Sequence, residues 1–319
     1  MNGQFFADTA SAQPWLVGDV QVAGISAPPL YRTHSRVFEQ KYPSFDYAGM
    51  VPVNTDGDMW DVGTIVYSGD VAGVAQYVGG KAFDIPNASV SLTQGISNFY
   101  LAGVGYELGL QEVNRAAKMG VPIDTRKASA ARMVAEKFIY DRVIRGSTVK
   151  GFTGLINDAR VPTANAPTGA WATSTAAQKL ADVNAALNDV IVNSRETAMP
   201  NALLIPTSKF LAANNQTLDN TNSSVLTFLR TNNSYTAMTG QPLDIRPSRE
   251  LETAAANGTS GRLVAYEKSP DNVEFFLPGM FEFLAPFATS SMTWRVDGIM
   301  NVGQLEIYRP KTFSYRDGV

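Results

Sequence analysis

Residues that could perform chemistry are few in this sequence, and their spacing does not form an active site. His34 is the only histidine and cysteine is absent, so a nucleophile would have one candidate base and no thiolate. The glycines of residues 103–109 miss the dinucleotide-binding spacing by one residue. Gly80-Lys81 lacks the upstream glycine and the following Ser or Thr of a phosphate-binding loop. We therefore expect no enzymatic activity and no cofactor.

Charged residues are the remaining candidates. Asp56, Asp58 and Asp61 could contact a cation, but no glutamate follows at the spacing of a calcium-binding loop. An ordinary acidic turn is the simpler explanation, and we expect no metal site. Residues 51–114 carry a net charge of −6, from one lysine against seven acids, and residues 115–150 carry +6, from nine Lys or Arg against three acids. These segments could attract each other between copies of the chain, or each could be an ordinary solvated face.

The composition is that of a large folded protein with few charges. The chain has 319 residues, enough for about two domains, and 45% of them are hydrophobic. Only 17% are charged, against about 25% in an average soluble protein, so we expect much of the surface to be covered. No segment approaches the ~20 apolar residues of a membrane span. The N-terminus has neither a basic leader nor an unbroken apolar run, and we expect folding in a cytoplasm.

Residues 124–146 predict one long helix. Asp124 or Thr125 can cap its start, Gly146 suits a left-handed residue after its end, and neither glycine nor proline lies between them. Two apolar stripes lie on nearly opposite sides, one with Ala128, Ala131, Val134, Ala135, Phe138 and Ile139 and the other with Met133, Tyr140 and Ile144. We therefore expect a spine with other segments packed against both flanks.

Residues 60–101 predict a long β-ribbon. Alternating residues around Ile65 and Tyr67 and a second extended run at 90–99 flank Gly79-Gly80, a dipeptide typical of hairpin turns. A long unpaired ribbon is an edge that a monomer would have to protect, so we expect it to lie on another subunit. Residues 1–50, with prolines and aromatics but no sustained period, predict an arm that lies along another surface.

The other elements indicate the α+β class. A shorter helix is predicted at 108–119, and after the long helix the sequence predicts helices at 175–195, 208–214 and 223–230 and strands at 202–206, 243–246, 262–267, 273–277, 292–296 and 304–308. The order is extended, helical, mixed and extended again, which differs from the alternating β-α rhythm of a doubly wound sheet.

These parts together resemble a known family. The stretch YELGLQEVNRAAKMGVPIDTRKASAARMVAEKFIYDRVIRG, residues 106–146, with GFTGLIND at 151–158, is similar to a subfamily of major capsid proteins of tailed bacteriophages. In that subfamily a short helix, a Gly-Val-Pro link and the spine helix precede a Gly-Leu-Ile-Asn turn. The resemblance implies the Hong Kong 97-like capsid fold, with an N-arm, an extended β-hairpin called the E-loop, a long spine helix, and peripheral and axial domains.

The resemblance also implies a layout and a role. Residues 1–50 would be the N-terminal arm, 51–103 the E-loop, 104–150 with 281–319 the peripheral domain, and 151–280 the axial domain. The protein would be a structural subunit that self-assembles into hexamers and pentamers of an icosahedral shell around phage double-stranded DNA. The virion capsid would be assembled in the cytoplasm of the bacterial host. Two alternatives stay open: an encapsulin-type nanocompartment shell, which shares the fold, and a tail or baseplate protein.

Further expectations concern partners and processing. A portal, possible separate scaffolding or cement proteins, and non-specific contact with the DNA are implied, but no membrane. Lys81 is the only lysine between Pro43 and Ala117, and the carboxylate needed to join it to a neighbour's asparagine cannot be placed. We therefore expect no covalent cross-link and one band near 34.4 kDa on denaturing gels. No scaffolding-like helix precedes the arm, so we also expect an untrimmed N-terminus.

The matched charges predict contacts between subunits. The acids Asp61, Asp70 and Asp84 would face a neighbour's Arg126, Lys127 or Arg132. Lys81 would lie at the tip of the ribbon, either in the same interface or in solvent. Arg142 and Arg145 would face packaged DNA. Exposed ion pairs contribute at most about 1 kcal/mol each. We therefore expect the charges to set register while apolar burial supplies most of the affinity.

Overall fold

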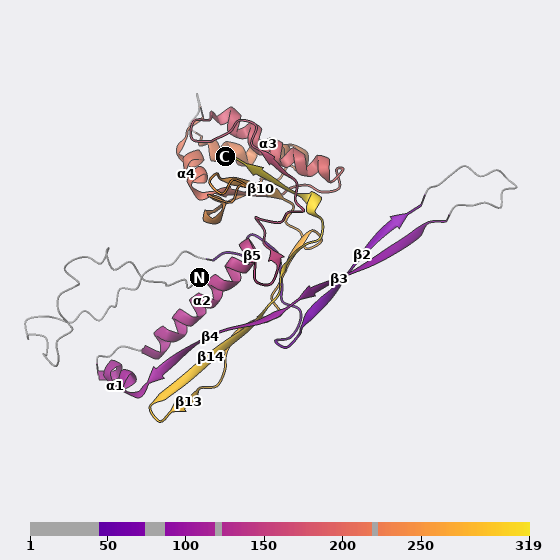
Figure 1. Ribbon diagram of the computed structural model, residues 1–319. Coiled ribbons are helices and arrows are strands. Elements are labelled where there is room, and N and C mark those ends of the chain that lie inside the picture. Colours follow the sequence, from indigo (N-terminus) through magenta and orange to yellow (C-terminus); the bar gives the residue numbers. More distant parts are fainter. Residues whose placement is uncertain (1–44, 74–86, 119–122, 219–222) are drawn as a thin grey trace, which may run out of the picture. The chain divides into compact units, whose positions relative to one another are not determined.

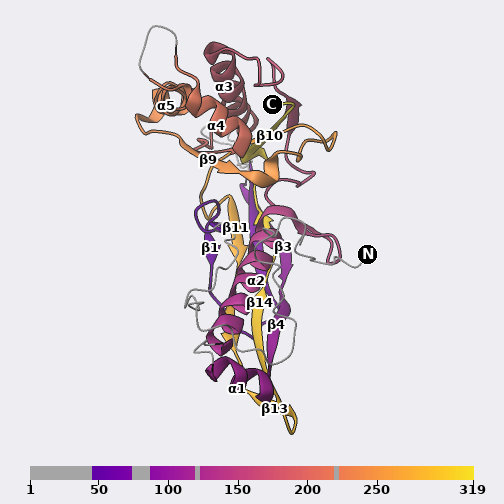
Figure 2. The same cartoon turned by 90° about the vertical axis from the view of Figure 1, so that its left-hand side faces the viewer.

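Figures 1 and 2 show a computed structural model of the chain. The structure describes residues 45–73, 87–118, 123–218 and 223–319, without the side chains of residues 70 and 71. All of these belong to one unit of the chain, Ser44–Val319. Helices and strands are both abundant, and strands distant in sequence pair with one another, which confirms the predicted α+β class. Most of the arm predicted over residues 1–50 lies outside the described part.

The long helix α2, Ile123–Arg145, confirms the predicted spine. It lies along strand β4, Tyr100–Gly109, which pairs antiparallel with β14, Thr293–Val302, over its whole length (Figure 1). The buried face of the helix carries apolar side chains at helical spacing, namely Ala131, Ala135, Ile139 and Val143. Gly146 follows with a φ of 71°, the left-handed conformation expected after the helix end.

The second flank of α2 is covered only toward the C-terminal end of the helix. There Ile144 is fully buried, and the ring of Tyr140 packs against that of Phe45 with 5.5 Å between centroids. Nearer the middle of the helix, Met133 and Val134 are exposed. Val134, which the sequence placed on the first stripe, is therefore not packed within the described subunit, and the second stripe is covered at Tyr140 and Ile144 but not at Met133.

Strand β4 is an element that the sequence did not predict as a strand. Its glycines allow the partner strand to approach closely. A Cβ atom on Gly103 would lie 2.9 Å from the carbonyl oxygen of Gly298, and one on Gly105 would lie 2.8 Å from that of Val296. The spacing that resembled a nucleotide-binding loop therefore serves backbone pairing with β14.

Two small sheets complete this part of the subunit. Strand β14 pairs along its other edge with β12, Gly279–Phe283, and further along with β13, Phe287–Ser290, while helix α1, Leu110–Lys118, directly follows β4. The other sheet has the order β1-β11-β15. Its strands are β1 (Val53–Asn54), β11 (Val273–Phe276) and β15 (Leu305–Ile307), with β1 parallel and β15 antiparallel to β11.

A five-stranded sheet in the order β7-β16-β10-β8-β9 builds a second core. Its strands are β7 (Thr163–Asn165), β16 (Phe313–Asp317), β10 (Arg262–Tyr266), β8 (Ala202–Pro206) and β9 (Asp244–Ser248). Strands β8 and β10 are buried at every residue, because other strands pair with both edges and helices cover the sheet. The last strand of the sequence, β16, lies inside the sheet between β7 and β10.

Helices pack against this sheet. Helix α3, Ala176–Asn193, contributes Val183, Leu187 and Val190 to the core, and its start is fixed by a capping box between Thr175 and Gln178. The smaller elements are α4 (Thr207–Asn215), α5 (Val225–Thr231), α6 (Ser234–Thr239), the 3₁₀ turns η2 (Arg249–Leu251) and η3 (Pro310–Thr312), and the short hairpin of β5 (Gly146–Ser147) and β6 (Phe152–Thr153).

The ribbon consists of β2, Gly63–Ala72, and β3, Ser89–Asn98, which pair antiparallel from Gly63↔Asn98 to Ala72↔Ser89 (Figure 1). This confirms the predicted hairpin arms. The expected turn at Gly79-Gly80-Lys81 falls in a part of the chain that the structure does not describe. The predicted helices and strands elsewhere are also confirmed, with ends that differ by a few residues. Besides β4, the elements that were not predicted are the strands β1, β5, β6, β7, β12, β13 and β16, the helix α6 and the 3₁₀ turns η2 and η3.

Candidate assembly interface

The β2–β3 ribbon has one apolar face and one polar face. Directly opposed residues share a face, so the pairs Ile65↔Ile96, Tyr67↔Gln94 and Gly69↔Leu92 alternate with Thr64↔Ser97, Val66↔Gly95 and Ser68↔Thr93. The first set is apolar and open to solvent, with exposed fractions of 51% for Ile65, 66% for Tyr67, 71% for Leu92 and 64% for Ile96. An exposed apolar patch of this kind marks an interaction site. We name it the ribbon face: Ile65, Tyr67, Leu92 and Ile96.

The sequence contained part of the signal for the ribbon face, since Ile65 and Tyr67 lie two residues apart between Thr64 and Ser68, although Val66 between them is also apolar. What the sequence did not give was the register between the two strands, which places Ile96 beside Ile65. A two-stranded ribbon is at best marginally stable in water. Its apolar face therefore has a strong reason to be buried against another surface.

The base of the ribbon is fixed to the rest of the subunit. The Phe99 N–H donates to the Val62 carbonyl at 2.8 Å, and the Phe99 ring packs against Phe276 with 5.7 Å between centroids. The Ser97 hydroxyl donates to the Glu306 carboxylate at 3.1 Å. The ribbon thus leaves the subunit from an anchored base.

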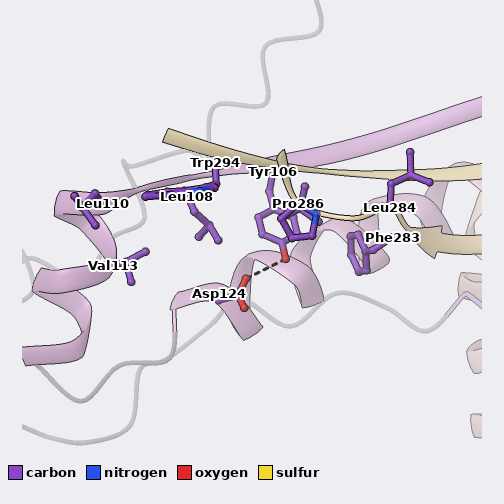
Figure 3. Close-up of a pocket in the computed structure, with 10 residues that line it drawn as sticks. Tyr106, Leu108, Leu110, Val113, Asp124, Phe283, Leu284, Pro286 and Trp294 are labelled. Carbon is purple, nitrogen blue, oxygen red and sulfur yellow. Dashed lines mark hydrogen bonds between the residues drawn. The ribbon is translucent and has the colours of Figure 1, made fainter. Parts of the chain in front are cut away.

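A second apolar surface lies between α1, β4 and the segment that joins β12 to β13 (Figure 3). It is a groove with a volume of about 500 Å³, lined mainly by Leu108, Leu110, Val113, Phe283, Leu284, Pro286 and Trp294. At its floor the Tyr106 hydroxyl donates to the Asp124 carboxylate at 3.0 Å. Burial and that carboxylate raise the pKa of Tyr106. The groove offers shape and apolar contact and no group arranged for a reaction.

Two of the basic residues predicted to face other molecules form ion pairs inside the subunit. Lys127 donates to the Glu112 carboxylate at 2.6 Å and to the Glu107 carbonyl at 2.8 Å, which fastens α2 to α1 and β4. This hydrogen bond lowers the pKa of Glu112. Arg145 pairs with Glu250. Both side chains are therefore engaged before any partner arrives.

Aromatic rings hold two other basic residues of α2. The guanidinium of Arg132 lies 5.5 Å from the centroid of the Phe283 ring, beside the groove. That of Arg142 lies 4.8 Å from the Phe138 ring, with its Nε buried and without a hydrogen-bond partner. Arg126 is partly buried in the first turns of α2.

The predicted acids are dispersed. The Asp61 carboxylate accepts a hydrogen bond from the Asp58 N–H at 2.7 Å and remains exposed at the base of the ribbon. Asp70 lies in β2 opposite Ser91. Lys81 and Asp84 fall in the part of the chain that is not described. Of these acids only Asp61 has a described side chain, and no described ion pair joins it to a basic residue of its own α2.

Other kinds of site are not found in the described residues. They contain no group of three or more His, Asp or Glu side chains that could hold a metal ion. None of the described helices is long and apolar enough to span a membrane. What stands out is exposed apolar surface on rigid elements, which is a property of proteins that bind other proteins.

Comparisons with known structures show the fold. The chain is similar to the capsid of Myoviridae phage XM1, with 15% sequence identity, a TM-score of 0.79, and coverage of 93% of this chain and 99% of that one. It is also similar to Mycobacterium phage Ogopogo, with 12% identity, a TM-score of 0.56, and coverage of 90% and 96%. A virus-like particle from Pyrococcus furiosus matches with 11% identity, a TM-score of 0.51, and coverage of 85% and 91%. At such low identity these likenesses establish the fold, which is Hong Kong 97-like.

The sequence itself gives the family. No curated protein matches it. The family model described as "Major capsid protein" matches residues 73–319, well over half of the chain. The match includes β3, the spine, both cores and the last strand. The chain therefore belongs to the major capsid protein family and is a structural subunit of a capsid shell.

Proposed function

We propose that this subunit assembles into hexamers and pentamers of a closed icosahedral shell around phage double-stranded DNA, and that the ribbon face is the contact that joins neighbours. The observation that carries the proposal is the ribbon face itself, four large apolar side chains that the subunit leaves in solvent on an anchored ribbon. Burying such side chains yields about 25 cal/mol per Å² of apolar surface. Obligate interfaces of this type commonly bury thousands of Å² in total.

The proposal includes the family layout. Residues 1–50 serve as the arm, 51–103 as the E-loop that contains the ribbon, 104–150 with 281–319 as the peripheral domain, and 151–280 as the axial domain. The buried residues form two cores that meet at the five-stranded sheet: one face of the sheet, with Leu204, Val264 and Tyr315, packs into the core of α2 and β14, and the other face, with Leu203 and Leu263, packs into the core of α3. A portal, separate scaffolding or cement proteins, and packaged DNA complete the set of partners, and assembly takes place in the host cytoplasm.

Charge contacts have a smaller part in the proposal. Asp61, Asp70 and Asp84 approach a neighbour's basic residues near α2, among them Arg126, Lys127 and Arg132, of which Arg132 lies against the Phe283 ring of its own subunit. The internal pair of Lys127 with Glu112 favours a structural role for that lysine. Arg142 and Arg145 are the residues proposed to contact DNA. Within the subunit, the Arg142 side chain lies over the Phe138 ring and that of Arg145 pairs with Glu250.

The test is assembly of the chain expressed alone and of a ribbon variant. Electron micrographs of the unmodified protein should show closed shells. The variant Ile65→Ser/Leu92→Ser should give a folded subunit with an unchanged unfolding midpoint and no shells, because both side chains are exposed in the subunit and buried only in the assembly. The matched control is Ser68→Ala/Thr93→Ala, which changes one opposed pair on the polar face of the same ribbon.

Two outcomes would overturn the proposal. Normal shells from the Ile65→Ser/Leu92→Ser variant would show that the ribbon face is not the joining contact. Unmodified protein that stays monomeric at high concentration, with its separately expressed partners present, would contradict shell assembly itself. The contents of particles from infected cells decide between a virion and an encapsulin-type compartment: packaged double-stranded DNA supports the proposal, and an enzyme cargo would replace it.

A further inference from the structure

A short acidic loop between β1 and β2 presents an exposed tryptophan. We name residues 55–62 the acidic loop. Trp60 is 72% exposed and the neighbouring Val62 80%, and the same loop carries three exposed acids, Asp56, Asp58 and Asp61. Tryptophan is enriched among the residues that dominate binding energy at protein interfaces. So large an aromatic side chain in solvent beside three charges has no role in the core of its own subunit.

The acidic loop is rigidly held, so its exposure is not the result of a loose chain. The buried Asn301 side chain donates to the Asp58 carbonyl at 3.3 Å and to the Asp61 carbonyl at 2.9 Å. The Asp58 N–H donates to the Asp61 carboxylate at 2.7 Å. The sulfur of Met59 packs so closely on Gly279 that a Cβ there would lie 2.7 Å from it. A loop ordered before binding loses little entropy when it binds.

A basic pocket of complementary charge lies elsewhere on the subunit. It has a volume of about 360 Å³ and is lined by Arg195, at the end of α3, and by Arg309 and Lys311, in and beside η3. All three are exposed, and within the described part of the chain none of them forms an ion pair. Three unneutralised cations around one depression are costly to bring together unless an anionic partner arrives.

The backbone that carries Arg195 is strained. Arg195 has a φ of 56° in a helix-ending motif, in which its N–H donates to the Val192 carbonyl at 3.1 Å and the Glu196 N–H to the Ile191 carbonyl at 2.8 Å. Glycine is the residue favoured at this position, because other residues meet a steric cost in the left-handed region. Glu196 is also left-handed, with a φ of 63°, and the chain reversal at these two residues brings Arg195 to the pocket.

The acidic loop and the basic pocket lie at opposite corners of one small sheet. In the order β1-β11-β15, the loop leaves the end of β1 at one edge, and the pocket begins after the end of β15 at the other edge. Because β1 is parallel and β15 antiparallel to β11, the two strands end in opposite directions. Complementary surfaces at two different places on a subunit make a head-to-tail contact, which forms a ring when the rotation between neighbouring copies closes.

We infer that the acidic loop of one subunit docks into the basic pocket of the next copy of this chain around a capsomer, with Trp60 against the guanidinium groups and the carboxylates beside the cations. The inference rests on the proposed function, since it concerns how the shell's rings close. The aromatic face attracts the cations, and the contact excludes water from the charges around it. It replaces the expected partners of Asp61 on a neighbour's α2 with Arg195, Arg309 and Lys311.

A cysteine pair tests the contact directly, because the chain contains no cysteine of its own. The variant Trp60→Cys/Lys311→Cys is assembled, treated with a short bismaleimide and run on a denaturing gel. We expect a ladder of covalent multimers ending at five and six subunits. The variant Val62→Cys/Arg309→Cys keeps Trp60 and should give the same ladder. The contact can therefore still be tested if loss of Trp60 in the first variant weakens it. The matched control is Asp271→Cys/Lys311→Cys, with its first cysteine at the exposed turn before β11.

The outcomes separate this contact from the proposed function. If the unmodified chain forms no oligomer, the proposed function fails and the contact fails with it. If shells form but neither cysteine pair gives more multimers than the control, only the contact is overturned. A charge test distinguishes the acidic loop from the phosphate groups of DNA as the anion that the pocket binds. Lys311→Glu should block assembly, and Asp56→Lys/Lys311→Glu should restore it. If Lys311→Glu shells form normally and only fail to retain DNA, the pocket binds phosphate groups and the inference is wrong.

Discussion

The ribbon and the five-stranded sheet are both built from extended chain, yet their surroundings differ completely. Strands β8 and β10 are buried at every residue, with partners on both edges. Among the described strands, β2 and β3 pair only with each other. Every residue of β3 is exposed except Ser97, which lies near the base of the ribbon. The sheet has a core of its own, whereas the ribbon has an apolar face without one.

This difference shows where each region obtains its stability. Side chains of the sheet contribute to folding of the single subunit, so their loss should appear in the free energy of unfolding before assembly. Side chains of the ribbon face can contribute only when a second surface covers them. The two kinds of variant should therefore separate folding from assembly, and the following predictions test that separation, from the largest effect to the smallest.

The largest effect should come from the buried ion pair of the sheet. Arg262 donates from Nε to the Asp317 carboxylate at 2.6 Å and from a second nitrogen at 2.9 Å, and both side chains are almost fully buried. Arg262→Met leaves the carboxylate buried without its partner and should lower the free energy of unfolding by about 3–5 kcal/mol. Urea denaturation of the unassembled subunit measures this free energy of unfolding. Arg262→Met/Asp317→Leu should be less damaging than the single change, and an equal or larger loss would argue against a charge effect.

The direct comparison uses one leucine from each region. Leu203 is fully buried in β8, and Leu203→Ala should destabilise the subunit by about 2–5 kcal/mol, through lost burial and the cavity left behind. Leu92→Ala in the ribbon face should change subunit stability by less than about 0.5 kcal/mol. Light scattering should show the opposite for assembly: per folded subunit, Leu92→Ala should reduce assembly more than Leu203→Ala. Equal loss of stability from the two changes would mean that the ribbon has a core inside the subunit.

Acid should weaken the subunit through Asp158. Burial opposes ionisation of this carboxyl, but hydrogen bonds from the side chain and backbone of Arg160 outweigh it and lower its pKa. The stabilisation is present above about pH 4, the unfolded value, and is lost as the pH falls through the lower folded value. Asp158→Asn should cost about 1–3 kcal/mol at neutral pH and flatten the loss of stability below pH 4. Denaturation at a series of pH values measures both effects. If the Asp158→Asn subunit loses stability below pH 4 as steeply as the unmodified one, the assignment is wrong.

The smallest effect should have the opposite sign. Arg195→Gly relieves the left-handed strain at the end of α3 and should stabilise the subunit by about 0.5–1 kcal/mol. The same change removes a cation of the basic pocket and should slow assembly. Gly240, which ends α6 with a φ of 73°, supplies the control, because Gly240→Ala should destabilise by a similar amount. A less stable Arg195→Gly subunit would show that the arginine side chain supports the fold.

The sequence predicted best what depends on neighbouring residues. Helices α2 and α3 have caps, good helix formers and apolar spacing in one continuous stretch, and both were predicted within a few residues. Strand β4 was missed because its glycines, explained by the close approach of β14, carry no strand signal of their own. Strand β16 was missed because its place inside the sheet depends on partners more than 40 residues away in sequence.

The candidate interface divides in the same way. The ribbon was predictable from alternation and a Gly-Gly turn, but its apolar face required the register. The basic residues of α2 were correctly seen as a cluster, yet the sequence could not show that Lys127 and Arg145 have carboxylate partners within the subunit. The basic pocket was not predicted at all, because Arg195 and Lys311 come together only through packing of η3 near the end of α3.

The place of β16 has a consequence for the order of events during synthesis. Residues 313–317 fill the gap between β7 and β10, so neither of those strands has its full set of partners until β16 has left the ribosome. Contacts this distant in sequence also make folding slow. A chain whose translation stops before Phe313 leaves two strand edges facing an empty slot and the carboxylate for Arg262 missing. Such a fragment lacks the central partner of both strands, and completion of the five-stranded sheet therefore depends on synthesis of β16.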